Sequence, residues 1–473
     1  MINTTIFVAF IFGVIAGWYA SFNIVILCLL SFICLLFLSF SSRLYRRPYL
    51  FVAFLTVFFA LLGILWVTPY SLKKPQDFVG KDNFFLIKVT SIPKEGYLKR
   101  TFYAQVERVG GFSTSFRVKV NSFSHRKIDY RTSYLVRGRL SAKQFKHNSF
   151  YILWLKKDSY IKELPSNWID NFIRKVTFAL VFHFKKYLSP EAYKFSSSVF
   201  LGRRELAEWW MSSLLRKAAV AHLFAISGLH VGLISGMLFF TLKIFRIRFR
   251  ARLIIAVIFM FIFALCAGMR PSIVRASIMF SFLGAGFFLK RKISVFDSLS
   301  IAGIVCLLLN PLWVLDVGFQ LSFLSVFSII VGFNLFSVSL GSRSFLINYV
   351  KGIFFSTVFV FIAIFPLVSL YFGRVYLLGI AANIILIPIF TFILILIFIF
   401  VGLYFVPFLA TYAAEVLSLS VSLFLRFAFL MGKIRFAYFT FSMKGVSVFL
   451  YYTLLLLGAV LVHRYKFNND LSV

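Results

Sequence analysis

Two histidines stand inside one apolar, glycine-rich stretch, AHLFAISGLHVGLISG at positions 221–236. His222 and His230 are separated by eight residues, with Ser227 and Gly228 between them. Ionisable side chains at membrane depth are rare, and they usually face a bundle interior or a water-filled path. On one continuous helix the two rings would lie about 12 Å apart, too far to share a metal ion. The stretch therefore predicts either packed interior histidines or a polar path at a helix broken at Ser-Gly.

Three glycines, Gly228, Gly232 and Gly236, recur every four residues in the same stretch. This spacing predicts a helix face that a neighbouring helix can approach closely, because glycine has no side chain to hold the backbones apart. The stretch thus combines polar groups with an expected helix-packing surface.

A second polar stretch, GMRPSIVRA at 268–276, joins two apolar segments. Pro271 suits the first turn of the second helix. Arg270 and Arg275 would then lie near the ends of membrane spans. They could snorkel to the interface or form a cationic mouth for phosphate groups, because guanidinium groups bind phosphate oxygens in pairs. Both interpretations remain open.

Other polar residues interrupt the apolar segments further along. Asp297 follows a short basic cluster and could neutralise it. Asp316 and Gln320 lie one helical turn apart, so they could cap a helix start or hydrogen-bond across a bundle. Asn383 and Pro388 fall inside a long apolar run, which is typical of a broken helix that lines a path.

Several enzyme signatures are missing from the sequence. It contains no zinc-hydrolase, P-loop or serine-hydrolase motif, and six histidines in 473 residues make a two-metal site hard to build. The four cysteines lie in apolar segments without metal-type spacing. We therefore expect no catalytic residue, no metal and no cofactor, and interpret the chain as a protein that is not an enzyme.

The composition indicates which elements must position these residues. The chain is 61% hydrophobic and 14% charged, whereas soluble domains have about 25% charged residues. A soluble multidomain enzyme and a disordered basic tail are both excluded. A polytopic α-helical membrane protein of about twelve spans is predicted, at 4–20, 22–40, 49–69, 213–242, 252–268, 271–289, 294–313, 317–340, 346–370, 376–405, 408–431 and 446–462.

The short basic loops between these spans all fall on one side, which predicts that both termini are cytoplasmic and residues 70–170 external. Residues 171–188 interleave apolar and basic side chains, as an interfacial amphipathic helix does. The predicted division is N-terminal transmembrane helices (1–69), an external domain (70–170), amphipathic or interfacial helices (171–212) and a main transmembrane domain (213–473).

The external segment alternates apolar and polar residues as strands do. Five strands are predicted at 84–90, 101–107, 115–120, 134–140 and 150–155, with a hairpin turn at Gly110-Gly111. Five short strands in about a hundred residues favour a small β-barrel of the OB-like kind. An immunoglobulin-like sandwich would need about seven.

Positive charge concentrates on this segment. The whole chain has 51 Lys+Arg and 15 Asp+Glu, a net charge of +36, and residues 71–170 contribute 20 and 8, or +12. The preference for positive cytoplasmic loops cannot explain charge on an external domain.

The alternation places these charges on particular strand faces. Arg117 and Lys119 share one face, Arg137 and Arg139 share another, and Tyr103 and Phe112 lie nearby in the sequence. Basic pairs beside aromatic rings are typical of single-stranded nucleic-acid binding. A solvated basic face, or one that contacts anionic lipid headgroups, is the open alternative.

Five motifs follow one another along the chain: AHLFAISGLHVGL at 221–233, GMRPSIVRASIM at 268–279, DSLS with NP at 297–311, DVGFQLSF at 316–323, and FPLVSLYFG with AANIILIP at 365–388. In content, order and spacing they resemble the ComEC family of competence proteins. The external basic barrel is also similar to that family's N-terminal OB-like domain, so the resemblance covers nearly the whole chain.

The resemblance implies an inner-membrane channel that passes single-stranded DNA into the cytoplasm during natural transformation. A DNA receptor on the outer face and a cytoplasmic motor or single-strand-binding proteins are the expected partners, besides membrane lipid. The motif positions are His222, Ser227, Gly228, His230, Arg270, Arg275 and Gln320. Many members carry a C-terminal metallo-β-lactamase-like domain, and some carry a cysteine pair in the external domain. Neither feature is found here, so we expect that the chain does not encode the nuclease activity.

A second function remains compatible with the residues. Membrane-embedded His and Arg would serve a phosphate headgroup as well as a nucleotide, so the chain could be a polytopic transporter or enzyme that handles an anionic lipid or polymer. A purely structural scaffold fits poorly with so many polar residues at membrane depth.

Overall fold

The computed structural model describes residues 2–19, 60, 63, 75–96, 99–124, 126–145, 148–224, 227–336, 344–376, 379–433, 439–443, 446–455, 457–458 and 462. The chain forms two compact units. The first comprises residues 1–182 and 246–319, and the second comprises residues 183–245 and 320–473. The spans expected at 22–40 and 49–69 fall almost entirely outside the described residues.

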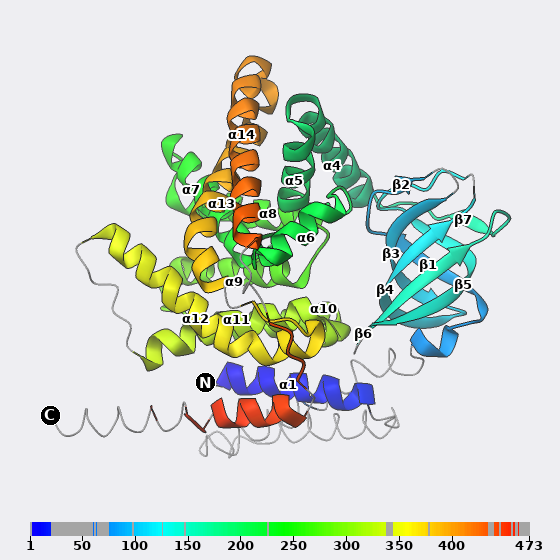
Figure 1. Ribbon diagram of the computed structural model, residues 1–473, viewed down its shortest axis with the longest axis horizontal. Helices are drawn as coiled ribbons and strands as arrows, with labels where there is room; N and C mark the ends of the chain where they lie inside the picture. The colour runs from blue at the N-terminus through cyan, green and yellow to red at the C-terminus, as the bar shows by residue number, and fades with distance from the viewer. Residues whose placement is uncertain are drawn as a thin grey trace. The chain divides into compact units, whose positions relative to one another are not determined.

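The first unit combines a β-barrel with apolar helices (Figure 1). Its helices are α1 (Ile2–Tyr19), the first part of α4 (Trp168–Tyr187), α8 (Phe249–Cys266), α9 (Pro271–Phe288) and α10 (Val295–Leu309), followed by the 3-10 turn η4 (Pro311–Leu315). Helix α10 packs against α9 and α1. The contact with α1 is close at Gly303, where an added Cβ would lie 2.1 Å from Cε2 of Phe7.

The described part of the second unit is mainly helical, with one isolated antiparallel bridge between Val375 and Phe439. It holds α5 (Pro190–Phe200), α6 (Trp209–Lys217), the 3-10 turn η3 (Ala221–Phe224), α7 (Gly228–Ile244), most of α11 (Val317–Leu335), α12 (Phe345–Phe372), α13 (Gly379–Gly402), the turn η5 (Leu403–Phe405), α14 (Pro407–Gly432) and a helix at Val446–Leu455. Helix α13 packs against α14, α12 and α7.

Within the described residues, six helices are long and apolar enough to cross a membrane: α8, α9, α11, α12 from Ile347, α13 from Ala382, and α14. Shorter apolar helices lie at Ile6–Ile15, Gly228–Ile244, Val295–Leu309 and Val446–Leu455. These helices, together with the barrel, confirm the predicted fold class. The predicted spans from residue 252 onward coincide with α8 to α14 and the last helix.

The glycine-rich span predicted at 213–242 is not one helix. It is divided into the end of α6, the turn η3 and helix α7. Helix α6 cannot continue because Ala219 adopts a left-handed backbone conformation, with φ of 62°. Helix α7 then begins at Gly228, with Ser227 as its N-cap, at the Ser-Gly step that one of the two sequence interpretations named as a break.

The barrel has five principal strands, β1 (Asp82–Val89), β3 (Arg100–Val109), β4 (Phe112–Ser122), β5 (Ser133–Phe145) and β6 (Asn148–Leu155), with short β2 (Lys94–Glu95) and β7 (Ile161–Glu163) at its edges. Strand β1 pairs antiparallel with both β3 and β5, and a parallel pair, β4 with β6, closes the ring. Gly110 and Gly111, with φ of 54° and 91°, form the β3–β4 turn. The five predicted strands and the hairpin are confirmed.

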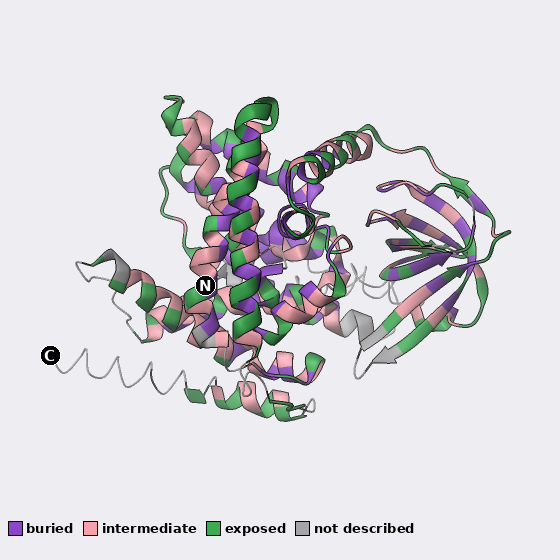
Figure 2. Ribbon diagram, turned by 45° about the horizontal axis from the view of Figure 1, so that its top comes forward, coloured by how far each residue is buried: buried purple, intermediate pink, exposed green. Residues whose placement is uncertain are grey.

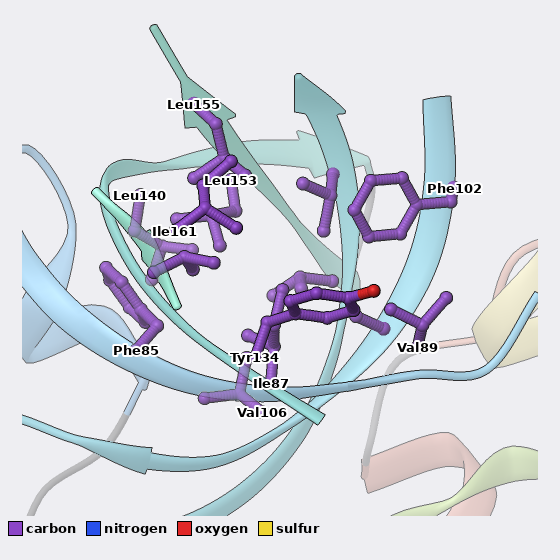
Figure 3. Close-up of a cluster of buried hydrophobic side chains, with 14 of the residues drawn as sticks. Phe85, Ile87, Val89, Phe102, Val106, Tyr134, Leu140, Leu153, Leu155 and Ile161 are labelled. Carbon is purple, nitrogen blue, oxygen red and sulfur yellow. The ribbon is translucent and has the colours of Figure 1, made fainter. Parts of the chain in front are cut away.

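Alternate residues of each strand fill the barrel interior. Phe85, Ile87 and Val89 of β1 are at most 1% exposed. Figure 3 shows them meeting Phe102, Val106, Tyr134, Leu140, Leu153, Leu155 and Ile161 from the other strands, and Figure 2 shows buried and exposed residues alternating along the strands. Each fully buried side chain of this kind contributes roughly 1.5–3 kcal/mol.

One carboxylate fixes the barrel to helix α4 of the same unit. Asp170 accepts hydrogen bonds from Nζ of Lys88 at 2.6 Å and from Nη1 of Arg131 at 3.0 Å. Arg131 also donates to the Leu265 carbonyl at the end of α8. The Asp170 and Arg131 side chains are 14% and 12% exposed, so this linkage is largely shielded from water.

Candidate nucleic-acid interface and membrane-embedded polar residues

The first basic pair lies on the outer face of β4. Arg117 and Lys119 are exposed, while Val118 between them is buried in the core. Lys119 is directly opposite Tyr103 of β3, and the Arg117 guanidinium carbon lies 4.8 Å from the centre of the Tyr103 ring. A cation over an aromatic face is attracted by the ring electrons. The expected grouping of Arg117, Lys119 and Tyr103 therefore occurs as one surface cluster.

The second basic pair lies on the outer face of β5. Arg137 faces Phe84 of β1, with its guanidinium carbon 5.9 Å from the centre of the ring. Tyr160 meets the same ring edge-to-face at 5.8 Å. Arg139 is opposite Asp82 on one side and Trp154 of β6 on the other.

The two basic pairs are separated by strand β6. Lys119 neighbours Ile152 and Arg139 neighbours Trp154 across the sheet, so two strand spacings of about 4.8 Å lie between β4 and β5. Trp154 stacks on Phe123 with ring centres 6.3 Å apart and an interplanar angle of 12°. The surface over β4, β6 and β5 thus alternates cations with exposed aromatic rings.

Phe84, Phe123, Trp154 and Tyr160 were not among the residues picked from the sequence. The alternation of side chains along a strand could have revealed Phe84 and Trp154. Phe85 and Leu153 point into the core, so their neighbours must point outward. Tyr160 and Phe123 lie beyond strand ends, where alternation carries no information. Phe112, which was expected near the basic residues, is exposed at the β3–β4 turn.

His230 is buried at the first turn of α7 in the second unit. Its Nδ1 atom lies 3.1 Å from the Ser227 backbone nitrogen and 3.0 Å from the Ser227 hydroxyl oxygen, which forms a capping box. The ring is 0% exposed and packs edge-to-face on Phe390 of α13 at 5.1 Å. The Leu223 carbonyl lies in its surroundings, but Nε2 has no partner with hydrogen-bond geometry in the described part.

His222 lies within electrostatic range of the His230 ring. It belongs to η3 and not to the same helix. A side-chain carbon added at Gly232 or Gly236 would meet no described atom within 4 Å, so the helix-packing role of Gly228, Gly232 and Gly236 remains a prediction.

Helix α13 places Asn383 and Phe390 on one face, seven residues apart, with Pro388 inside the helix. The Asn383 side-chain oxygen is buried and has no hydrogen-bond partner among the described residues. Gln320 of α11 accepts a hydrogen bond from the Tyr371 hydroxyl of α12 at 3.1 Å. Gln320 therefore links two helices of the second unit, as one of its two sequence interpretations expected.

Arg275 lies inside α9 of the first unit and is 4% exposed. Its Nη1 atom is 3.7 Å from the Met279 sulfur, and the Cys306 thiol of α10 lies within electrostatic range. Arg270 is the N-cap of this helix and Pro271 occupies its first turn, as the sequence predicted. In this structure the Arg275 side chain is therefore buried among protein atoms.

Two aspartates lie at helix starts in the first unit, Asp297 in the first turn of α10 behind its N-cap Ser294 and Asp316 as a cap of α11. The Asp297 N–H donates to the Ser294 hydroxyl at 3.0 Å, and this hydroxyl donates to the Asp297 carboxylate at 2.8 Å. Asp316 accepts from the Phe319 N–H at 2.9 Å at the start of α11. In the described part of the chain no three His, Cys, Asp or Glu side chains converge as a metal site would require.

A family model described as competence protein matches residues 199–465, more than half of the chain. The chain belongs to the competence protein family. ComE operon protein 3 of Bacillus subtilis (strain 168) is 27% identical over 208 residues, which are 43% of this chain and 26% of that protein. The chain thus aligns with about a quarter of this curated relative. No solved structure matches the chain.

The family match confirms the resemblance seen in the motifs, and it covers all five of them. It begins after the barrel, whose last strand ends at Glu163. The function of the barrel must therefore be argued from its own surface.

Proposed function

We propose that this competence-family protein is a channel of the cytoplasmic membrane that passes single-stranded DNA into the cytoplasm during natural transformation. The family match and the relative from Bacillus subtilis support a role in competence, the state in which a cell takes up DNA. The apolar helices supply the membrane part. The observation that carries the proposal is the barrel surface, where Arg117 covers Tyr103 beside Lys119.

This surface has the chemistry that a DNA strand requires. Lysine and arginine neutralise the phosphates, and exposed rings stack with bases in a sequence-tolerant way. Arg117 and Lys119 on one side of β6, and Arg137 and Arg139 on the other, would hold the strand across the barrel. We assign to the barrel the capture of DNA outside the cell membrane, with both termini of the chain in the cytoplasm.

The membrane helices supply the path in this proposal. His230, Arg275, Gln320 and Asn383 are polar side chains on apolar helices, and such residues are costly in lipid unless they serve an interior or a path. A DNA receptor would deliver the strand, and a cytoplasmic motor or single-strand-binding proteins would draw it inward.

A deletion strain tests the proposal directly. Loss of the protein should abolish transformation by donor DNA with a selectable marker, and the wild-type gene in trans should restore it. Growth, envelope permeability and lipid composition serve as the controls. An envelope or lipid defect together with normal transformation would reject the channel and favour an anionic lipid or polymer as the substrate.

A further inference from the structure

A hollow of about 230 Å³ lies on the outside of the barrel over strand β1. Leu86 is central to its lining, because this residue is paired with Arg108 of β3 on one side and Leu135 of β5 on the other. The complete lining is Phe84, Leu86, Arg108, Gly110, Gly111, Leu135 and Leu164. The hollow is separate from the Tyr103, Arg117 and Lys119 cluster, which lies over β3 and β4.

The strands shape the hollow in two ways. A register shift between Leu86 and Ile87, opposite residues 106–108, lets Arg108 stand beside Leu86. The glycines of the β3–β4 turn leave one rim without side chains, and both need φ values that other residues rarely adopt. A side-chain carbon added at either glycine would meet no described atom within 4 Å.

The chemistry of the walls is aromatic and cationic. Phe84 is 45% exposed, Tyr160 packs on its edge, and the guanidinium of Arg137 lies 5.9 Å from its centre. The floor is apolar, and Arg108 adds a second exposed cation. A flat ring with negative charge attached on both sides would satisfy all these groups at once.

An unpaired nucleobase between its two phosphates has this shape and charge. The hollow is smaller than the 300–1,000 Å³ of sites for drug-sized ligands, which suits one base. In a duplex the bases are stacked inside the helix, so only a single strand can offer one. Stacking on an exposed ring is tolerant of sequence because every base has a flat face.

We propose that this hollow binds one unpaired nucleobase and makes the barrel prefer single-stranded over duplex DNA. The inference rests on the proposed function, since the barrel must contact DNA at all. The hollow adds a second DNA contact to the one on β4. Phe84 is its stacking residue, and Arg108 and Arg137 are its phosphate contacts.

The test uses the full-length protein in nanodiscs of zwitterionic lipid and labelled oligonucleotides of about 16 nucleotides. Phe84→Ala should weaken single-strand binding about 5- to 150-fold, the range that corresponds to removing one stacked base. It should leave duplex binding and the salt dependence nearly unchanged, because no cation is lost. Phe84→Tyr, which keeps the ring, should bind like the wild type. Because Phe84 is half-exposed, its truncation spares the core, and hydrogen exchange of the barrel checks this.

Removing the bases from the oligonucleotide tests the same contact from the DNA side. An oligonucleotide of abasic residues keeps its phosphates but loses its rings, so Phe84→Ala should no longer matter with this probe. Equal losses for the single strand and the duplex, or an unchanged affinity for the single strand, would overturn the base pocket. Wild-type protein that binds no DNA at low salt would instead reject the proposed function of the barrel.

Discussion

The backbone N–H of Ser227 donates a hydrogen bond to Nδ1 of His230 over 3.1 Å, at the first turn of α7. Because Nδ1 accepts this bond, the neutral ring carries its proton on Nε2. That second nitrogen is buried and has no hydrogen-bond partner in the described part of the second unit. His230 therefore closes the helix cap with one nitrogen, and its second nitrogen lies near the Leu223 carbonyl outside hydrogen-bond geometry.

Two variants separate the capping role of His230 from a role in the DNA path. His230→Ala removes both and should cost about 1 kcal/mol of stability through the lost cap. His230→Gln places a residue that favours capping boxes at the same position, so the protein should accumulate normally while transformation falls about tenfold or more. Immunoblots of membranes and transformation frequencies provide the measurements. Normal transformation of the Gln variant would restrict His230 to a structural role.

Arg275 should matter for its charge and not for its volume. Arg275→Met retains the length of the side chain, and replacing a buried charge by an apolar residue is often neutral or stabilising. We expect normal membrane levels and a loss of transformation of about tenfold or more, partly restored by Arg275→Lys. The matched control is Arg250→Met, at an exposed position of α8. If the Met variant transforms like the control, Arg275 does not contribute to the path.

The pair on β4 should bind phosphates. Arg117→Ala and Lys119→Ala should each weaken single-strand binding and lower the slope of log affinity against log salt by about 0.7. Lys157→Ala, at an exposed position after β6, serves as the control. The readout is fluorescence anisotropy across a salt series with the full-length protein. An unchanged slope in both variants would remove this pair from the DNA surface.

Asp170 should hold the barrel to α4. Asp170→Asn removes the charge that Lys88 and Arg131 share, and losing such charged hydrogen bonds costs about 1.5–3 kcal/mol. Hydrogen exchange should rise in β1 and around Arg131, and protease cleavage between β7 and α4 should become faster. Asp158→Asn, in an exposed turn, should change neither. Identical exchange in the two variants would contradict the linkage.

Alkaline pH should weaken the barrel through Tyr134. Burial raises the pKa of this phenol above its ordinary value of 10.0, so the folded state keeps a proton that the unfolded state loses. The resulting stability is complete below pH 10 and is lost as the pH rises through the folded-state pKa. Tyr134→Phe loses the hydrogen bond from the Asp129 N–H and about 1 kcal/mol at neutral pH.

The measurement compares the stability of the wild type with that of Tyr134→Phe over a range of pH. The stability difference between wild type and Tyr134→Phe, followed by hydrogen exchange of the barrel strands, should shrink above pH 10. A constant difference would show that the hydroxyl does not titrate on unfolding.

Local patterns explain why much of the fold could be predicted. Each principal strand has one face in the core, so alternation around Ile87 or Val118 revealed it. The membrane helices carry apolar runs long enough to be recognised without any partner. A break at Ser227-Gly228 was one of two interpretations of this stretch, because Ser-Gly within a span can unwind a helix.

The contacts of the candidate site join residues that lie far apart in the sequence, so they could not be predicted from it. Asp170 meets Lys88 across 82 positions and Arg131 across 39, and no local pattern reports such a pairing. Phe84 and Arg137 face each other only because β1 pairs with β5 as well as with β3. The capping role of His230 was missed because the usual capping-box residue at that position is Glu or Gln.

The closed ring of strands also has a mechanical consequence. A DNA strand drawn inward would pull on the barrel through β4 and β5, and neither of these strands is free to peel away, because each is bonded to neighbours on both sides. The tension would be distributed over the hydrogen bonds of several strand pairs. It would pass from the barrel to helix α4 through the contacts of Asp170. In the proposed role, the closed ring would therefore resist the tension of a DNA strand that is drawn inward.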